Sequence, residues 1–596
     1  MAGTYRSPSP DAPWQPSYVA LLWRHGAAPP GLATIKSVVP RQGLSNLFEQ
    51  EGISLFTEEQ VPGLGRMHDA SEDIVIIGSL FDRDGHPVEQ LSRDSNSAEP
   101  VHSRLFRQFW GSYIAFYKDA HGNHSVIRDP GGGLRAYFID RGSFAVVTDH
   151  LPRWLEELIG LSTTIDEEAL ANALAMPLMA THRSLLRGVV QMPAGGVLRW
   201  SRSGPDSKLA WTPSIAGRES HADPNRMRQS VMTSIRGWTS VHRRFTIELS
   251  GGLDSAIVLG CAARLGALDR VFAIDLATTY PGGDERELAR AAADLWGIQL
   301  TEKVFAPTQL DYGPILTGPQ PLEPNLYGLD PLLEGAVAET AKLHNCDAIL
   351  TGQGGDAVFF QLPTARVALD YLLHRGSRGL FSGPVFDAAR RTRKSIWSVH
   401  ALFARYRMGK LEAERMPATT CLLGKSALDH LNRNWGDHPW LQVNEQLLPG
   451  KQTHCLMIAN CQLFNGPSRR SAVAAMRHPL MSQPVVEAWL SAPTFVLSDG
   501  TQDRAFARRL FQDLLPPSIA RRRGKGDTSV YYRRALVENL PLLRRHLLHG
   551  RLVKSEFLDA PALDRLLTEE QMLGAEEARL IPSLASFESW ARYWGL

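Results

Sequence analysis

Apolar and polar positions follow one pattern in the first third of the chain and another in the rest. Before about residue 215, short apolar runs at 73–77, 111–117 and 144–148 are separated by turns rich in Gly, Asp and His. Runs of this length between turn residues predict β-strands. After residue 165 the apolar residues recur at helical spacing, which predicts a helix with Asp166 as its N-cap. We therefore expect an α+β domain that is rich in strands.

The chain between about residues 225 and 360 alternates between apolar strands and amphipathic helices. Strands are expected at 244–249, 271–276 and 348–351, one helix at 255–265, and another that is capped by Asp284 and ends at Gly297. Repeated strand–turn–helix units predict a doubly wound parallel α/β sheet, in which ligands bind beyond the carboxyl ends of the strands. From about residue 360 the pattern is mostly helical.

Length and composition limit the number of domains and the class of protein. A chain of 596 residues is too long for a single core. Polar segments that carry Gly and Pro, at 201–207 and 212–223, predict one domain at 1–215 and a second at 216–596. The formal net charge of +2 argues against an obligate nucleic-acid binder.

Cysteine spacing and hydropathy predict the compartment. None of the five cysteines forms a CxxC pair, so zinc sites and disulfide frameworks are not expected. No apolar run approaches the ~20 residues of a membrane span, and residues 1–16 lack the pattern of a signal peptide. We expect a cytoplasmic protein that contacts neither membrane nor nucleic acid.

The segment that follows the strand at 244–249 carries the strongest chemical signal. It contains Ser250, Gly251, Gly252, Asp254 and Ser255. Glycines with positive φ let successive backbone N–H groups surround an anion at the start of a helix. The two serines add hydroxyl donors. A carboxylate repels phosphate unless a cation lies between them, so we expect Asp254 to bind Mg²⁺.

A second glycine-rich turn follows the strand at 348–351. It reads Gly352-Gln353-Gly354-Gly355-Asp356. Together the two turns resemble the ATP pyrophosphatase superfamily, which includes asparagine synthetase, β-lactam synthetase and lasso-peptide macrolactam cyclases. The resemblance implies that ATP is bound by both turns, including Gly352, Gln353 and Gly354, and that Asp254 and Asp356 hold Mg²⁺. Both aspartates are then catalytic.

Two later segments are also similar to this superfamily. In residues 514–527, Lys525 matches a lysine that stabilises the charge developing on phosphate and on the tetrahedral intermediate, although a solvated basic loop stays an alternative. The turn at Arg477-His478-Pro479 is similar to a turn of the superfamily, and a structural role is an equally good interpretation of it.

The N-terminal region resembles the glutaminase domain of asparagine synthetase at 128–138 and 185–195. That domain, of the class II glutamine-amidotransferase (Ntn) type, uses a cysteine directly after the initiator methionine as its nucleophile. Position 2 is Ala2, and the first cysteine is Cys261. We therefore expect a degenerate glutaminase-like domain that makes no ammonia.

An enzyme that activates a carboxylate without making ammonia needs another amine. An amine on the substrate itself reacts faster because it is held close to the activated carboxylate. The expected function is therefore that of a lasso-peptide macrolactam synthetase, which adenylates an Asp or Glu side chain of a precursor peptide and closes it with the N-terminal amine. An asparagine synthetase using ammonia or a small amine, or a β-lactam synthetase-like enzyme, is the alternative.

Two questions stay open at this level. Relatives carry a glutamate or tyrosine at the position of Gln353, and glutamine cannot act as a general base, so the base for the attacking amine is unassigned. The resemblance also makes a leader peptidase and a leader-peptide-binding protein plausible partners.

Overall fold

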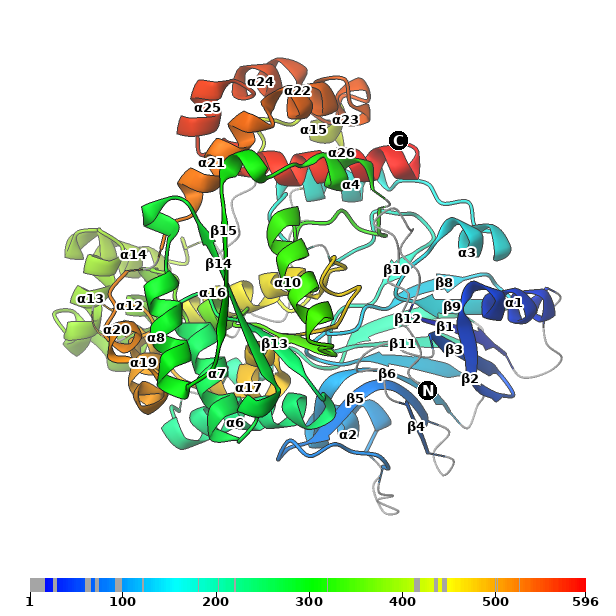
Figure 1. Cartoon of the computed structure of the whole chain (residues 1–596), viewed down its shortest axis with the longest axis horizontal. Coiled ribbons are helices and arrows are strands. Elements are labelled where there is room, and N and C mark those ends of the chain that lie inside the picture. The colour runs from blue at the N-terminus through cyan, green and yellow to red at the C-terminus, as the bar shows by residue number, and fades with distance from the viewer. Residues whose placement is uncertain are drawn as a thin grey trace.

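Three β-sheets form the framework of the protein, whose computed structural model is shown in Figure 1. The structure describes residues 17–24, 29, 31–58, 66–69, 74–91, 99–119, 123–180, 182–201, 203–218, 221–318, 320–411, 419–432, 438–441, 447–498, 500, 502–524 and 526–596. Two sheets are antiparallel and belong to the N-terminal region, and the third is parallel.

The two antiparallel sheets have six strands each. The first has the order β10-β8-β9-β1-β3-β2, with β10 at Val190–Gln191, β8 at Tyr137–Asp140, β9 at Phe144–Thr148, β1 at Tyr18–Trp23, β3 at Ile53–Glu58 and β2 at Leu44–Gln50. The second has the order β12-β11-β7-β6-β5-β4, with β12 at Gly204–Leu209, β11 at Gly196–Ser201, β7 at His124–Arg128, β6 at Phe109–Lys118, β5 at Ile74–Asp82 and β4 at Arg66–Asp69. The strands predicted at 73–77, 111–117 and 144–148 are thus confirmed over their described residues, which exclude Asp73, and two of them are parts of longer strands.

Strand β1 shows why this region is so apolar. Successive side chains of a strand point to opposite faces. Tyr18 and Ala20 lie in the core between the two sheets, whereas Val19 and Leu21 lie in the core on the outer face. All six residues of β1 are buried, so both faces require apolar side chains.

Helices cover the outer face of each antiparallel sheet. The core outside the first sheet includes residues of α1 (Leu32–Val38), α3 (Arg153–Leu158) and α4 (Glu167–Ala175). The core outside the second includes residues of α2 (Val101–Gln108) and α6 (Pro224–Val241). The result is a four-layer arrangement of helices, two sheets and helices.

The third sheet has five parallel strands in the order β15-β14-β13-β16-β17. Their bounds are β13 Phe245–Glu248, β14 Val271–Thr278, β15 Leu300–Phe305, β16 Ala348–Leu350 and β17 Ala475–Arg477. Helices α7 (Leu253–Arg264) and α8 (Arg286–Trp296) contribute to the core on one face, and α10 (Pro331–Leu343) to the core on the other. The predicted parallel α/β sheet with helices on both faces is confirmed.

The strand order identifies the place where a ligand is expected. The chain leaves β13 for β14 and β15 on one side and returns to β16 and β17 on the other. The loops that follow the neighbouring strands β13 and β16 therefore diverge, which creates a crevice at their carboxyl ends.

Helices make up most of the chain after residue 360 and surround the parallel sheet (Figure 1). Their bounds, with the remaining short helices, are α5 Pro213–Gly217, α9 Gly313–Thr317, α11 Gly355–Val358, α12 Arg366–Arg375, α13 Gly383–Arg391, α14 Ile396–Arg407, α15 Lys425–His430, α16 Pro449–Asn460, α17 Gln483–Ser491, α18 Thr494–Leu497, α19 Ala505–Leu510, α20 Pro517–Ala520, α21 Ser529–Glu538, α22 Leu540–Leu548, α23 Arg551–Lys554, α24 Ala560–Leu566, α25 Glu569–Gly574 and α26 Ile581–Trp594. None of the described helices is both long and apolar enough to cross a membrane.

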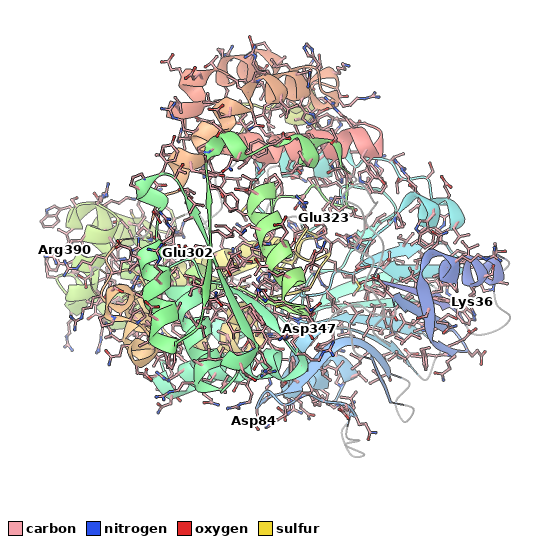
Figure 2. The ribbon with its side chains drawn as sticks, viewed as in Figure 1. Lys36, Asp84, Glu302, Glu323, Asp347 and Arg390 are labelled. Carbon is pink, nitrogen blue, oxygen red and sulfur yellow. The ribbon has the colours of Figure 1, made fainter. Side chains whose placement is uncertain are left out.

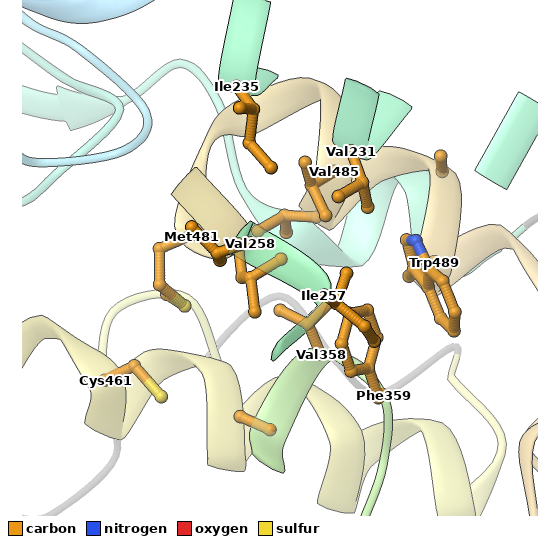
Figure 3. Close-up of a cluster of buried hydrophobic side chains, with 14 of the residues drawn as sticks. Val231, Ile235, Ile257, Val258, Val358, Phe359, Cys461, Met481, Val485 and Trp489 are labelled. Atoms are coloured by element: carbon orange, nitrogen blue, oxygen red, sulfur yellow. The ribbon is translucent and has the colours of Figure 1, made fainter. Parts of the chain in front are cut away.

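The helix that follows β13 is fixed by a dense core. Figure 3 shows Ile257 of α7 among side chains from α6, α11 and α17. Trp489 of α17 is fully buried there and packs against Phe359, with ring centroids 4.4 Å apart and ring planes tilted by 53°. Burying a large apolar side chain contributes about 2–3 kcal/mol, so this core holds the start of α7 firmly.

The predicted helix caps were partly right. Asp166 accepts a hydrogen bond from the Ala169 amide at 3.1 Å, and Gly297 ends α8 with φ 66°. Asp284 is not the N-cap of α8, because a 3₁₀ turn at Pro281–Gly283 delays the helix by one residue and leaves Glu285 at that position. Asp284 instead binds the Arg286 side chain at 2.6 Å.

The C-terminal helices return to the N-terminal sheets. Figure 1 shows α21–α26 at the top of the view, and their apolar residues share a core with the first sheet. Arg153 of α3 lies over the Tyr593 ring at 5.1 Å and donates a hydrogen bond to its carbonyl. Buried clusters thus draw side chains from both sides of residue 215, and the division into 1–215 and 216–596 stays a prediction.

Candidate active site

A cavity of about 490 Å³ opens at the carboxyl ends of β13 and β16. Both glycine-rich turns predicted from the sequence line it, as do parts of α16, of α19 and of the segment 519–524. Segments more than 250 residues apart in sequence therefore meet at the point where the strand order reverses, which is the expected ligand site of such a sheet.

The first turn shapes the start of α7. Gly251 has φ 68°, and a Cβ there would lie 2.7 Å from the Glu285 carbonyl oxygen. Gly252 has φ −81°, so the expectation of positive φ holds for Gly251 alone. The Ser250 amide donates to Ser255 Oγ at 3.3 Å, which draws the turn around the N-terminus of the helix. Helix N-termini of this kind favour anions.

The second turn touches the first. A Cβ on Gly352 would lie 2.6 Å from the Ser255 amide nitrogen, and one on Gly355 would lie 2.4 Å from Asp254 Cγ. Gly354 adopts φ 86° and precedes the short helix α11, whose second residue is Asp356. Only residues without a side chain allow the two turns this approach.

The convergence of the turns brings Asp254 and Asp356 to one point, as predicted. The sequence did not predict what lies between them. Arg504 Nη1 donates to Asp254 Oδ2 at 2.6 Å and also to Asp356 Oδ1. The Arg504 side chain is 3% exposed, and its backbone has φ 49° at the N-cap of α19.

The surroundings of Arg504 fix its charge. Burial alone would lower the pKa of the guanidinium, but Asp254, Asp356 and Asp503 raise it above its ordinary value. Arg504 Nη2 lies 2.7 Å from Asp503 Oδ2. A permanent cation therefore occupies the space between the two carboxylates.

The two carboxylates fit Mg²⁺. Their oxygens are hard ligands, they come from adjacent strand ends, and they already share one positive charge. Mg²⁺ is usually held by one or two carboxylates together with phosphate oxygens and water. Asp254 and Asp356 are accordingly the residues that would hold the ion.

The segment that should carry the catalytic lysine reaches the cavity. Arg522 and Gly524 line it, and Glu285 binds both Arg522 Nη2 at 2.5 Å and the Gly526 amide. Lys525 itself lies outside the described residues, so its role stays a prediction. Glu285, for which the sequence required no catalytic role, positions this segment over the turn after β13.

The carboxylates that line the cavity are not free to act as general bases, because arginines bind them. Glu248, at the end of β13, binds Arg470 at 2.5 Å, while Glu285 binds Arg522 and the two aspartates share Arg504. Each carboxylate among the described lining residues thus has an arginine partner. Gln353 lines the cavity beside them but cannot accept a proton at useful pH. The base for the amine stays unassigned.

One wall of the cavity, which we call the acceptor wall, comes from α16 and the turn after it. Its residues carry no formal charge at neutral pH: Thr453, Leu456, Met457, Asn460, Cys461 and Phe464. Burial raises the pKa of the Cys461 thiol to about 12, so this sulfur is neither a nucleophile nor a base.

The N-terminal sheets support the acceptor wall. Arg135 Nε donates to the Asn465 carbonyl at 3.2 Å, and the Gly131 carbonyl accepts from Asn465 Nδ2 at 3.2 Å. Arg135 Nη1 also binds Glu323 at 2.8 Å. Glu323 lies between the parallel sheet and the antiparallel sheets in Figure 2.

The Arg477–Pro479 turn has the structural role that was its alternative interpretation. The Thr351 hydroxyl lies 2.7 Å from His478 Nδ1, and the other ring nitrogen lies 3.1 Å from the Phe464 carbonyl. Burial lowers the pKa of His478 to about 4, so the ring is neutral. It connects the second turn to the acceptor wall.

Comparison with protein families gives one match, and it covers most of the chain. The model of the asparagine synthase family matches residues 226–592, a range that contains both turns, Arg504 and the acceptor wall. No curated protein matches the chain.

Solved structures offer only distant likeness. A glutamine phosphoribosylpyrophosphate amidotransferase from B. subtilis, complexed with ADP and GMP, has 10% identity and a TM-score of 0.20 over 48% of this chain and 65% of that one. A glutamine-dependent NAD⁺ synthetase from Acinetobacter baumannii, in complex with ADP, has 11% identity and a TM-score of 0.18 over 48% of this chain and 59% of that one. The chain thus spans less than two thirds of the length of either protein, and the TM-scores are too low to support a structural argument.

Proposed function

Because the chain belongs to the asparagine synthase family, we propose that it is a ligase that closes a peptide into a macrolactam of the lasso-peptide kind. Enzymes of this family are ATP-dependent ligases that form AMP. The proposed substrate is a precursor peptide. Its Asp or Glu side chain is activated as an acyl adenylate and then joined to the peptide's N-terminal amine, and pyrophosphate and AMP are released.

The observation that carries this proposal is the convergence of Asp254 and Asp356 on the anion-binding turn at Ser250. Mg²⁺, when bound by these carboxylates, supplies Lewis-acid stabilisation of the charge on the phosphates. The chain itself contributes the N–H groups at the start of α7, the hydroxyls of Ser250 and Ser255, and a fixed position for both carboxylates. Such preorganised groups stabilise the charge that develops when the bond between the first and second phosphates breaks.

The composition of the acceptor wall favours a peptide over a free amino acid as the substrate. Free aspartate carries an α-ammonium and an α-carboxylate that need charged partners when they leave water. Among the described residues of the acceptor wall, only Thr453 and Asn460 carry polar side chains apart from the protonated thiol. In a peptide, both α-groups are amides, which require hydrogen bonds but no counter-charge.

The amine in this proposal comes from the peptide. The first cysteine in the sequence is Cys261, and it is buried in α7 with its pKa raised to about 12 by burial. An intramolecular amine gains an effective molarity of ~10⁵ M or more when it is well oriented. The degenerate glutaminase-like region then serves to hold the acceptor wall, through Arg135 and Gly131.

The family match itself favours a second candidate, an asparagine synthetase or β-lactam synthetase-like enzyme that uses ammonia or a small amine. The purified protein should be incubated with ATP, Mg²⁺ and either aspartate and ammonium or a leaderless peptide with a free N-terminus and an internal Asp or Glu. We expect AMP release and a peptide product lighter by one water, without asparagine. Rapid asparagine formation would replace the first proposal by the second.

The proposed partners follow from the substrate. A precursor peptide must lose its leader before its N-terminal amine is free, so a leader peptidase and a leader-peptide-binding protein are proposed to act together with this enzyme. Co-purification of the enzyme with these proteins from cells that contain the precursor peptide is the direct measurement.

A further inference from the structure

A second cavity, of about 520 Å³, adjoins the candidate active site. Leu362, Met457 and Gly524 line both cavities, so the two cavities share a boundary. The segment 361–363, the end of α13 and the loop before residue 525 form the walls of the second cavity.

Arginines dominate the charge of the second cavity. Arg391, Arg393 and Arg523 line it, and Asp503 is the carboxylate among its described lining residues. Asp503 is already bound by Arg504 at 2.7 Å and by Arg508 at 3.0 Å. These two arginines, on the side of the active site, therefore offset the charge of Asp503. The second cavity is thus positively charged, and we call it the arginine basin.

The three arginines differ in how they are held. Arg391 donates to the Gln361 carbonyl at 3.0 Å and to the Ser498 carbonyl at 3.4 Å, which fixes its side chain. Arg393 and Arg523 are exposed, and neither forms an ion pair with a residue that the structure describes. Their guanidinium groups are thus available to an anion that enters the basin.

The arginine basin lies next to Asp356, one of the two carboxylates suited to Mg²⁺. The Gln361 amide donates to the Asp356 carbonyl at 2.8 Å. With its side-chain amide turned so that the nitrogen faces the carboxylate, Gln361 also lies 2.5 and 3.0 Å from the two Asp356 oxygens. One residue, Gln361, therefore separates Asp356 from Arg391.

We propose that the arginine basin binds inorganic pyrophosphate on its way out of the active site. The proposal rests on the proposed function, in which the substrate carboxylate forms a bond to the first phosphorus of ATP and pyrophosphate leaves with the electron pair of the broken P–O bond. Pyrophosphate carries several negative charges and many acceptor oxygens, and guanidinium groups bind such oxygens in pairs.

The direction of exit follows from the charges around the cavity. The acceptor wall has no cation among its described residues, whereas the basin presents three. A leaving anion therefore gains stabilisation on the basin side and none at the acceptor wall, so product release and the path of the peptide are kept apart.

The test is a calorimetric titration of the full-length protein with sodium pyrophosphate in EDTA. Without a divalent metal, Asp254 and Asp356 do not attract the anion, and the arginines of the two cavities supply the cations, so the basin variant measures the share of Arg393 and Arg523. We expect the double variant Arg393→Gln/Arg523→Gln to bind pyrophosphate about 10-fold more weakly than the unaltered protein, which corresponds to one lost charge-assisted interaction. Arg391 is left in place because its contacts with two carbonyls support the fold.

The control changes the net charge equally. Arg390 and Arg405 are exposed on α13 and α14 but do not line the basin, and Figure 2 shows Arg390 at the outer edge of the molecule. Arg390→Gln/Arg405→Gln should keep its pyrophosphate affinity within about twofold of the unaltered protein. Circular dichroism checks that all variants are folded.

The outcomes separate this proposal from the proposed function. Equal pyrophosphate affinity in the basin variant, or an equal loss in the control, overturns the basin. AMP release is measured separately. If no carboxylate substrate yields AMP, the proposed function fails while the titration still reports on the arginines.

Discussion

Arg504 donates a hydrogen bond of 2.6 Å to Asp254, the first of two carboxylates that are suited to magnesium. The same nitrogen also contacts Asp356. A guanidinium and a divalent cation cannot both occupy the space between these oxygens. Arg504 must therefore move when the metal enters, and the phosphates of the nucleotide are acceptors that could receive it.

Removal of Arg504 should strengthen metal binding in the absence of nucleotide. We expect Arg504→Gln to bind Mn²⁺ at least ~10-fold more tightly than the unaltered protein when nucleotide is absent, because no cation competes for the two carboxylates. Electron paramagnetic resonance of free Mn²⁺ measures the affinity. Adding Asp254→Asn to this variant should remove the gain, and equal affinities with and without Arg504 would refute the competition.

Loss of either metal-binding carboxylate should abolish turnover. Asp254→Asn and Asp356→Asn keep the size of each side chain but remove the charge that Mg²⁺ requires. We expect AMP release to fall by about 100-fold or more, with near-native circular dichroism. A variant that retains nearly normal AMP release would show that the metal is held elsewhere.

A methyl group at Gly355 should disturb the site by displacing the Asp254 side chain, although Gly355 itself carries no functional group. Its Cβ would lie 2.4 Å from Asp254 Cγ, so Gly355→Ala must displace this carboxylate. We expect AMP release to fall by about 10-fold or more, because a misplacement of about 1 Å can cost as much as 100-fold. Gly524→Ala is the matched control, since Gly524 lines the same cavity and its Cβ would meet nothing within 4 Å. Equal rates for the two variants would contradict the close packing of the turns.

Stability should depend on pH through Asp275, a buried residue of β14. Burial, followed by repulsion from Glu302 on the neighbouring strand, raises the pKa of Asp275 to about 7. The folded state thus holds this proton more tightly than the unfolded state, where the pKa is about 3.9. The contribution of the protonated group is complete below about pH 4 and is lost as the pH rises towards and through 7.

Asp275→Asn should remove this dependence, because the amide stays neutral. We expect the variant to be more stable than the unaltered protein at pH 8, by about 4 kcal/mol at most, and similar to it at pH 4. Urea unfolding at both pH values measures the difference. A constant difference between the two proteins would show that the carboxyl group is not protonated in the folded state.

Lys525 is expected to act on the transition state rather than on ATP binding. Lys525→Ala should lower kcat by about 100-fold or more and change the KM for ATP only slightly, since a preorganised cation acts on developing charge. Steady-state AMP release at varied ATP concentrations distinguishes the two parameters. A rise in KM at constant kcat would make Lys525 a binding residue.

Local patterns in the sequence predicted the local features well. The strand that ends at Glu248, the glycine turns and the end of α8 at Gly297 are all encoded by neighbouring residues. The two turns could be placed together because parallel strands share one edge for their carboxyl ends. Asp284 was assigned the wrong role as a cap because the short 3₁₀ turn before it gave no separate signal.

Contacts over long sequence distances could not be predicted in the same way. Arg504 lies 250 residues after Asp254, in a segment without glycine motif or clear periodicity, and its contacts depend on how α19 packs. The Asp503-Arg504 pair before a helix was the available signal, and such pairs are common on surfaces. The acceptor wall was missed as well, because apolar residues of α16 such as Leu456 are indistinguishable from core residues in sequence.

The core that α26 shares with the first antiparallel sheet has a consequence for synthesis of the protein. Trp590 and Trp594 belong to a core that also contains Val19 and Leu21, so strands made first lack part of their apolar cover until the ribosome has added α26. Incomplete chains expose apolar strands and aggregate readily. Nascent chains are therefore expected to depend on chaperones until α26 has been synthesised.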